Sequence, residues 1–158
     1  YGESPVSTAM GAYFNKKAYT DPTLRRKYTR MGFWVNIRLI RYPDVLLMAA
    51  ESANEKGLMG EASGYLEQVR AHARGTLTNV LPKVESLDQS VLREAIRHER
   101  RVELGLEPDR FYDLVRWGIA QEVLQAAGKN YQPKNALLPL PQTEIDKSNG
   151  VLVQNPDY

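Results

Sequence analysis

The spacing of apolar residues changes along the chain and predicts a mostly helical protein. From Pro43 to Ala53, apolar residues recur every three or four positions, which is the spacing of one face of an α-helix. Pro43 suits the first turn of this helix, and Gly57 suits the position just past its end. A second helix, with an apolar stripe of its own, is predicted from Glu61 to about Ala73. Because a short link joins the two helices, they are expected to form an antiparallel hairpin.

A second helical hairpin is predicted further along the chain. A third helix begins after a cap at Asp88 or Ser86 and runs to about Leu104. A fourth opens near Pro108 and continues to about Ala127. The two hairpins begin about 44 residues apart, which is longer than a 34-residue tetratricopeptide unit. The sequence therefore predicts two hairpins of similar plan without a strict repeat.

Irregular segments flank these helices. Residues 1–36 lack the apolar spacing of a helix and predict a loop-rich lead-in. At its end, Val35, Ile37 and Leu39 alternate with other residues and predict a short extended segment. Residues 37–127 hold the helical hairpins, and residues 128–158 predict an irregular tail with one turn at 142–146. The expected architecture is a single mostly α domain with long irregular loops and an irregular C-terminal tail.

Composition and charge exclude several functional classes. The net charge of +2, from 21 basic and 19 acidic residues, offers no excess for binding a phosphate backbone, so nucleic acid is not an expected partner. The sequence has no cysteine and two histidines, so neither a metal nor another cofactor is expected. No stretch approaches the roughly 18 apolar residues of a membrane span. The first residue is not Met, and we interpret the chain as part of a longer or processed protein.

The third helix carries two carboxylates on its apolar side. On a helical projection, Glu99 and Glu103 fall within the arc of the inward-facing residues. The apolar residues of that arc are Leu92, Ala95, Ile96 and Val102. The arginines on the opposite side are Arg93, Arg97, Arg100 and Arg101. Two carboxylates therefore face a neighbouring helix, away from the arginines of their own helix.

This carboxylate pair has a catalytic and a structural interpretation. Glycoside hydrolases use two carboxyl groups about 5 to 9.5 Å apart, and residues at i and i+4 have Cβ atoms about 5–6 Å apart. We favour the structural interpretation, because catalytic pairs normally flank a cleft from different elements. Arg116 of the fourth helix is the first choice of partner, with Asp113 one turn earlier to orient it, and Arg110 is the second. The expected ion network comprises Glu99, Glu103, Arg110, Asp113 and Arg116.

Several segments, taken in order, carry a family resemblance. They are IRLIRYPDVLLMAAES at 37–52, REAIRHERRVELGLEPDRFYDLVRWG at 93–118, and LLPLPQTEID with QNPDY within 137–158, preceded by DPTLRRKY at 21–28. This series resembles the C-terminal part of the SusD/RagB family, the nutrient-binding outer-membrane lipoproteins of Bacteroidetes. The resemblance covers about residues 21–158. It departs from the family pattern at Pro108 and Asp157, where glycine is usual.

The resemblance implies both a fold and a function. The implied fold is mostly α-helical with tetratricopeptide-like hairpins. The implied protein is exposed at the outer-membrane surface through a lipid anchor far upstream, and it works with a SusC-like TonB-dependent transporter. Members bind glycans or other nutrients and do not cleave them, so no enzymatic activity is expected.

Aromatic residues outside the predicted helices are candidate ligand contacts. Sugars stack their flat C–H faces on exposed rings, and polar groups nearby bind the hydroxyls. The candidate residues are Tyr13, Phe14, Asn15, Tyr19 and Trp34. Phe111 and Trp117 lie beside apolar neighbours on the fourth helix and are assigned to the core.

Two other functional classes stay open at this point. A helical-hairpin module could bind a peptide or a partner protein in a concave groove. A carbohydrate-active enzyme could use Glu99 and Glu103 as its acid and base. Oligosaccharide binding without turnover distinguishes a nutrient-binding protein from both alternatives.

Overall fold

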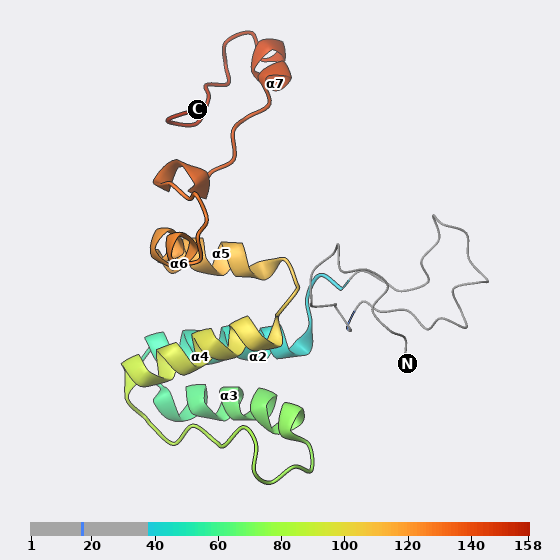
Figure 1. Cartoon of the computed structure of the whole chain (residues 1–158), viewed down its shortest axis with the longest axis vertical. Helices are drawn as coiled ribbons and strands as arrows, with labels where there is room; N and C mark the ends of the chain where they lie inside the picture. The colour runs from blue at the N-terminus through green and yellow to red at the C-terminus, as the bar shows by residue number, and fades with distance from the viewer. Residues whose placement is uncertain (1–16, 18–37) are drawn as a thin grey trace, which may run out of the picture. The chain divides into compact units, whose positions relative to one another are not determined.

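The computed structural model describes Lys17 and residues 38–158. The chain divides into two compact units, the first ending at Leu106 and the second beginning at Glu107. Figure 1 labels the helices of both units. Within the described residues every regular element is a helix, which confirms the mostly α fold. None of these helices is both long and apolar enough to cross a membrane. Apart from Lys17, the lead-in predicted for residues 1–36 lies outside the described part.

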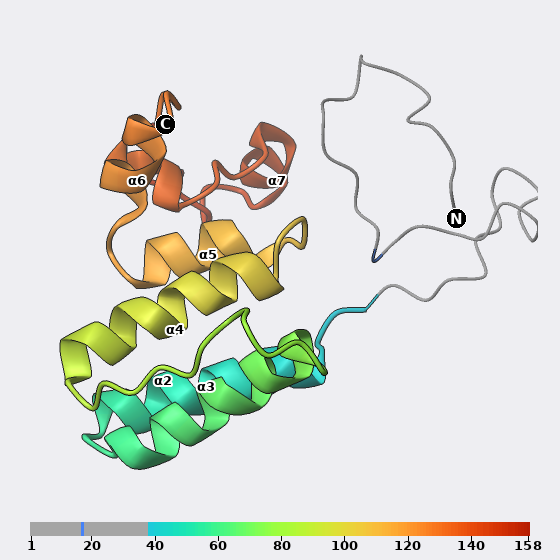
Figure 2. The same ribbon diagram turned by 60° about the horizontal axis from the view of Figure 1, so that its bottom comes forward.

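Among the described residues of the first unit there are three α-helices, and their positions agree with the sequence prediction. They are α2 (Tyr42–Glu55), α3 (Met59–Arg74) and α4 (Gln89–Glu103). α2 packs against both α3 and α4, as the two views in Figures 1 and 2 show. α2 and α3 form the expected hairpin. Gly57, with φ of 78°, ends α2 in a left-handed conformation that glycine adopts without steric cost.

A compact apolar core holds these three helices together. Leu47 and Ala50 of α2, Leu66 of α3, and Leu92 and Ile96 of α4 are all at most 1% exposed. Leu47 and Ala50 are three residues apart and Leu92 and Ile96 are four apart, which is the spacing of one helix face. Burying each leucine or isoleucine side chain contributes about 1.5–3 kcal/mol, so this core stabilises the packing of the three helices.

Local hydrogen bonds define where α4 begins. The Asp88 carboxylate accepts from the backbone N–H groups of Ser90 and Val91, at 2.9 and 3.0 Å. This is the N-cap arrangement that satisfies the free donors at a helix start. Of the two predicted caps, Asp88 therefore fills the position. Ser86 accepts from the backbone N–H of Asp88 at 3.2 Å and so supports the cap from outside the helix.

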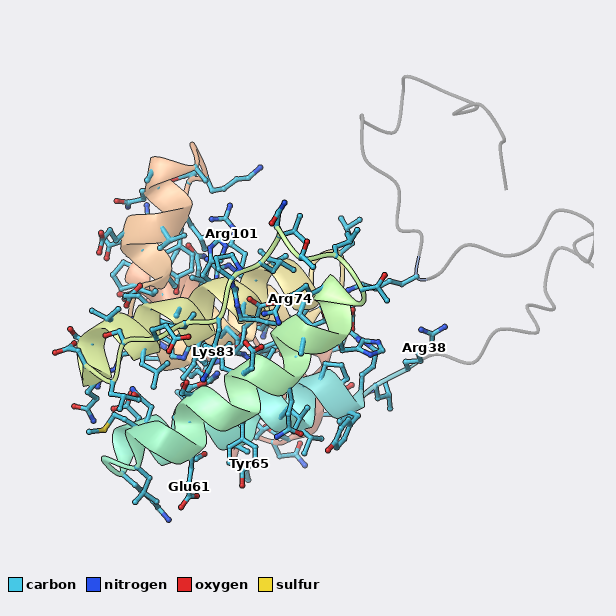
Figure 3. All side chains as sticks on the ribbon, turned by 90° about the horizontal axis from the view of Figure 1, so that it is seen from below. Arg38, Glu61, Tyr65, Arg74, Lys83 and Arg101 are labelled. Carbon is cyan, nitrogen blue, oxygen red and sulfur yellow. The ribbon has the colours of Figure 1, made fainter. Side chains whose placement is uncertain are left out.

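The connector between α3 and α4, residues 75–87, has no regular helix and is held by side chains of α3. Arg74 donates to the carbonyl oxygen of Leu81 through Nε at 3.0 Å and Nη2 at 2.7 Å. Figure 3 labels Arg74 near the end of α3 and Lys83 on the connector. Ser63 donates to the carbonyl oxygen of Val84. These bonds fix an irregular segment along the α3 surface.

The fourth predicted helix is divided into two, so the prediction of one continuous helix was wrong. α5 spans Asp109–Arg116 and α6 spans Ala120–Ala126. Gly118, with φ of 72°, lies between them. Its N–H donates to the carbonyl of Val115, and the next N–H, of Ile119, donates to the carbonyl of Leu114. This pair of bonds is a Schellman motif, which ends a helix at a left-handed glycine.

The second unit has a small core and a tail fixed by side chains. Leu114, Ala120 and Tyr131 are buried, and Phe111 and Trp117 pack against them, which confirms their assignment to the core. The tail contains a 3₁₀ helix, η3 (Pro133–Ala136), and α7 (Gln142–Lys147), which confirms the predicted turn. Beyond α7, the tail is held by the bonds that Gln154, Asn155 and Tyr158 make to the backbone of residues 137–140.

Candidate functional site

Glu99, the first carboxylate of the predicted pair, is buried between helices. The residue is 3% exposed, and its Oε2 atom accepts from Nη1 of Arg70 on α3 at 2.6 Å. The other terminal nitrogen of Arg70 donates to the carbonyl oxygen of Pro82 at 2.9 Å. One guanidinium therefore joins α3, α4 and the connector. This arrangement suits an interhelical link, because Arg presents several donors in a fixed planar geometry.

Glu103, the second carboxylate, is paired with an arginine that precedes α2. Nη1 of Arg41 donates to Oε1 of Glu103 at 2.8 Å, and Nη2 donates to the carbonyl oxygen of the same residue at 2.9 Å. Lys17 also donates to this carbonyl oxygen. The side chains of Arg41 and Glu103 are 16% and 21% exposed, so the pair lies at the edge of the unit. Arg41 thus ties the start of α2 to the last turn of α4.

The sequence correctly indicated that guanidinium groups pair with these carboxylates, but it did not name the two arginines of the first unit that do so, Arg70 and Arg41. The contacting groups belong to α3 and to the residue before α2. The predicted partners, Arg116 and Arg110, belong to the second unit, and a pairing with them stays a prediction. A helical projection identifies which residues face inward. It does not identify which neighbouring helix they meet.

Arg100 is a third buried ion-pair residue, and the sequence placed it on the wrong side of its helix. It was expected to face away from the core, but it is 5% exposed and its Nη1 donates to Oδ1 of Asp44 at 2.9 Å. Asp44 is in the first turn of α2, where the helix dipole also favours a negative charge. Val102, expected to face inward, is 58% exposed. The buried side of α4 is therefore turned toward Arg100, because α2 packs there.

Further polar contacts bind the other ends of α2 and α4. The Asn54 side-chain amide donates to the backbone carbonyl oxygen of Gln89 at 3.1 Å. The Gln89 side-chain amide in turn donates to the backbone carbonyl oxygen of Asn54 at 2.8 Å. Arg93 donates to both carboxylate oxygens of Glu55, at 2.6 and 2.7 Å. Hydrogen bonding from Arg93 lowers the pKa of Glu55 below its ordinary value of 4.5. The start of α2 thus contacts the end of α4, and the end of α2 contacts the start of α4, so the two helices are antiparallel.

The geometry of these pairs opposes a catalytic role for Glu99 and Glu103. A glycosidase acid needs a proton, and its partner carboxylate needs access to the sugar or to water. Glu99 instead lies almost fully buried with an arginine bonded to it. A buried ion pair of this kind fixes the position of two helices. Within the described residues, no group of three or more His, Cys, Asp or Glu side chains is placed to hold a metal ion.

The remaining members of the predicted ion network lie in the second unit. Arg116 donates to Oδ1 of Asp113 through Nε at 3.0 Å, which confirms that Asp113 orients this guanidinium. Asp113 is 4% exposed. The guanidinium carbons of Arg116 and Arg110 lie 4.9 and 5.9 Å from the ring centroid of Trp117, within the range of a cation–π interaction. These contacts stabilise α5 around its tryptophan.

The predicted ligand contacts belong to the N-terminal segment. Tyr13, Phe14, Asn15, Tyr19 and Trp34 all lie outside the described residues. Their role stays a prediction.

Comparisons with known proteins agree with the helical fold. A profile described as the SusD family matches residues 1–136. SusD-like protein P25 of Formosa agariphila is 39% identical over 153 residues, which are 92% of this chain and 27% of the relative. SusD-like protein P2 of the same organism is 36% identical over 127 residues, which are 75% of this chain and 25% of the relative.

A solved structure supports the same assignment. The crystal structure of a SusD homolog from Bacteroides thetaiotaomicron superposes with a TM-score of 0.70 at 30% identity. The match covers 84% of this chain and 30% of that one. The chain thus spans about a quarter of the length of the curated relatives it matches. With its sequence profile, its relatives and its fold in agreement, the chain belongs to the SusD family.

Proposed function

We propose that this chain is part of a non-catalytic binding protein of the cell surface. The protein captures a glycan or another nutrient and delivers it to a SusC-like TonB-dependent transporter in the outer membrane. The observation that carries this proposal is membership of the SusD family. An upstream lipid anchor, outside this sequence, would hold the protein at the membrane.

The ion pairs of the first unit support the non-catalytic part of the proposal. Glu99 and Glu103 are the acidic pair that best matched a glycosidase in the sequence, and each is bonded to an arginine of its own unit. A carboxylate that crosslinks helices is poorly placed to protonate a glycosidic bond. The helical hairpins thus act as scaffold for a binding surface.

Calorimetry of the full-length protein without its lipid tests the binding function. The protein would be titrated with a panel of oligosaccharides and then with free amino acids and short peptides. Saturable binding of an oligosaccharide or another nutrient is the expected result. Absence of binding across the panel, combined with specific binding of a folded protein, would favour a protein-interaction module instead.

Single alanine substitutions of Tyr13, Phe14, Tyr19 and Trp34 test the candidate contact residues. Aromatic contacts contribute about 0.5–1.5 kcal/mol beyond burial, so loss of a stacking ring should weaken binding about two- to tenfold. Tyr112→Ala is the matched control, because this ring is 67% exposed on α5 and is outside the candidate set. Equal affinity for wild type and all four variants would remove these residues from the binding site.

Product analysis tests the enzymatic alternative directly. The bound oligosaccharide would be incubated with wild type and with Glu99→Gln, and newly formed reducing ends would be measured. Neither protein should release any. Reducing ends released by wild type and absent with Glu99→Gln would show that the carboxylate is catalytic and contradict the proposal.

Reconstitution tests delivery to a transporter. The full-length protein and a SusC-like transporter of the same organism would be co-expressed, extracted in detergent and analysed by size-exclusion chromatography. Co-elution as a complex of defined stoichiometry is expected. Separate elution at all protein concentrations, with ligand binding intact, would limit the function to capture.

A further inference from the structure

α2 is apolar on the side that faces away from α3 and α4. Its buried side contains Leu46, Leu47 and Ala50. On the opposite side, Tyr42, Val45 and Met48 are 69%, 45% and 42% exposed. These three residues follow one another at a spacing of three and lie within an arc of about 120° on a helical projection. We call them, with the small residues Ala49 and Ser52 of the same arc, the outer α2 face.

The outer α2 face contains no charged residue, which sets it apart from the solvent side of α3. The exposed positions of α3 are polar or small: Gly60, Glu61, Gly64, Gln68, Ala71, His72 and Ala73. Two more exposed apolar residues, Leu39 and Ile40, immediately precede α2 and are 83% and 69% exposed. An amphipathic surface helix has one apolar stripe, and a helix that is apolar on both sides is normally buried on both. α2 therefore has the composition of a helix enclosed between two layers.

The relatives indicate what covers this face. The same fold occupies 30% of the chain of the Bacteroides thetaiotaomicron homolog, and this chain covers 27% of the 39%-identical relative. In both proteins the helical unit is therefore joined to more than twice its own length of further polypeptide. The ridge formed by Tyr42, Val45 and Met48 is about two turns long and has the i, i+3 spacing that fits the groove of a second helix.

We propose that the outer α2 face is an internal interface, covered in the full-length protein by an apolar helix from the polypeptide that lies outside this sequence. The covering helix presents its own apolar residues at a spacing of three and four. It thereby joins the ion-paired unit of α2, α3 and α4 to the rest of the molecule. This inference goes beyond the proposed function, because it concerns how the protein is assembled and holds whatever ligand is bound.

Cysteine labelling tests the proposal directly. The 158-residue sequence has no cysteine, so Val45→Cys and Gln68→Cys each introduce a single thiol. Both would be made in this chain and in the full-length protein, and maleimide labelling at each position would be followed by peptide mass spectrometry. In this chain the two positions should react at similar rates. In the full-length protein, labelling at position 45 should slow by about tenfold or more, while position 68 stays reactive.

Three outcomes would overturn the proposal. Fast labelling of Val45→Cys in the full-length protein would mean that the face is open to solvent. Slow labelling in the 158-residue chain at every protein concentration would assign the cover to residues of this chain. Slow labelling that depends on concentration, with a dimer in light scattering, would assign it to a second copy.

A second pair of variants guards against a labelling artefact. Val45→Lys combined with Met48→Lys should lower the melting temperature of the full-length protein and leave that of the 158-residue chain nearly unchanged. Gln68→Lys, on the polar side of α3, should change neither. Equal melting temperatures for the wild-type and double-variant full-length proteins would contradict the internal interface.

Discussion

The pairing of Arg70 with Glu99 offers the sharpest test of how the first unit is held together. The side chains of the two residues are 12% and 4% exposed, and their charged atoms are 2.6 Å apart. Arg70→Ala would leave the Glu99 carboxylate buried without its cation. Removing one partner of a buried ion pair costs about 3–5 kcal/mol, mostly because the remaining charge is uncompensated. The loss of the bond to the Pro82 carbonyl adds to this cost.

Denaturant unfolding followed by circular dichroism measures this loss. The matched control is Arg93→Ala, which breaks an ion pair between the same unit's α2 and α4, but one whose side chains are 30% and 47% exposed. An exposed pair is screened by water, so this variant should lose much less stability than Arg70→Ala. Equal losses for the two variants would mean that burial of Glu99 does not set the cost.

A double variant separates the buried charge from the loss of packing. Arg70→Met with Glu99→Leu removes both charges and keeps apolar volume at the site. Replacement of a buried ion pair by well-packed apolar residues is often neutral or stabilising, so this variant should recover most of the stability that Arg70→Ala loses. If the double variant is as unstable as Arg70→Ala, the uncompensated carboxylate is not the cause of the loss, and the reasoning fails.

Three more predictions follow from local features of the fold, each checked by chemical or thermal unfolding. Leu92→Ala should cost about 2–5 kcal/mol, since Leu92 is 0% exposed; a loss below about 1 kcal/mol would contradict the packed core. Gly118→Ala should lower the free energy of unfolding by about 1–2 kcal/mol, because Gly118 has a φ of 72°. Gly64→Ala, in open space within α3, should raise it by about 0.5–1 kcal/mol. A change of the same sign in both variants would refute the assigned conformations. Hydrogen bonds from Ser90 and Val91 lower the pKa of Asp88 below 3.8. The stabilising contribution of the ionised Asp88 is therefore complete above the ordinary pKa of 3.8 and is lost as the pH falls through the lowered pKa. The difference in melting temperature between wild type and Asp88→Ala should shrink as the pH falls, and a constant difference would contradict the ionic cap.

The break between α5 and α6 has a local sequence signal, Gly118. Gly118 lies inside an apolar periodicity that continues through Ile119 and Val123, and that periodicity favoured one helix. A glycine in a helix interior costs about 1 kcal/mol relative to alanine, whereas at the left-handed end of a helix it has no such cost. The glycine was the available signal for two short helices.

The partners of the charged residues could not be read from the sequence. The periodicity correctly turned Glu99 and Glu103 toward the interior, but it placed Arg100 on the opposite side, and the burial of Arg100 depends on its contact with α2. The pairing of Arg70 and Arg41 with these carboxylates likewise depends on which segments lie beside α4. Neither fact follows from residues near each other in the chain.

By itself, the sequence determined the positions of helices α2, α3 and α4, most residues of their apolar faces, with Val102 as an exception, and, through its ordered motifs, the SusD family. These features are local, because helix spacing, the Asp88 cap and the glycine ends act within a few residues of one another. The tertiary structure alone decided which arginine meets which carboxylate and which apolar face of α2 is covered within its unit. Such pairings join residues that are up to 62 positions apart in the sequence. They form when the helices pack together, and that packing depends on the whole unit and not on a few neighbouring residues.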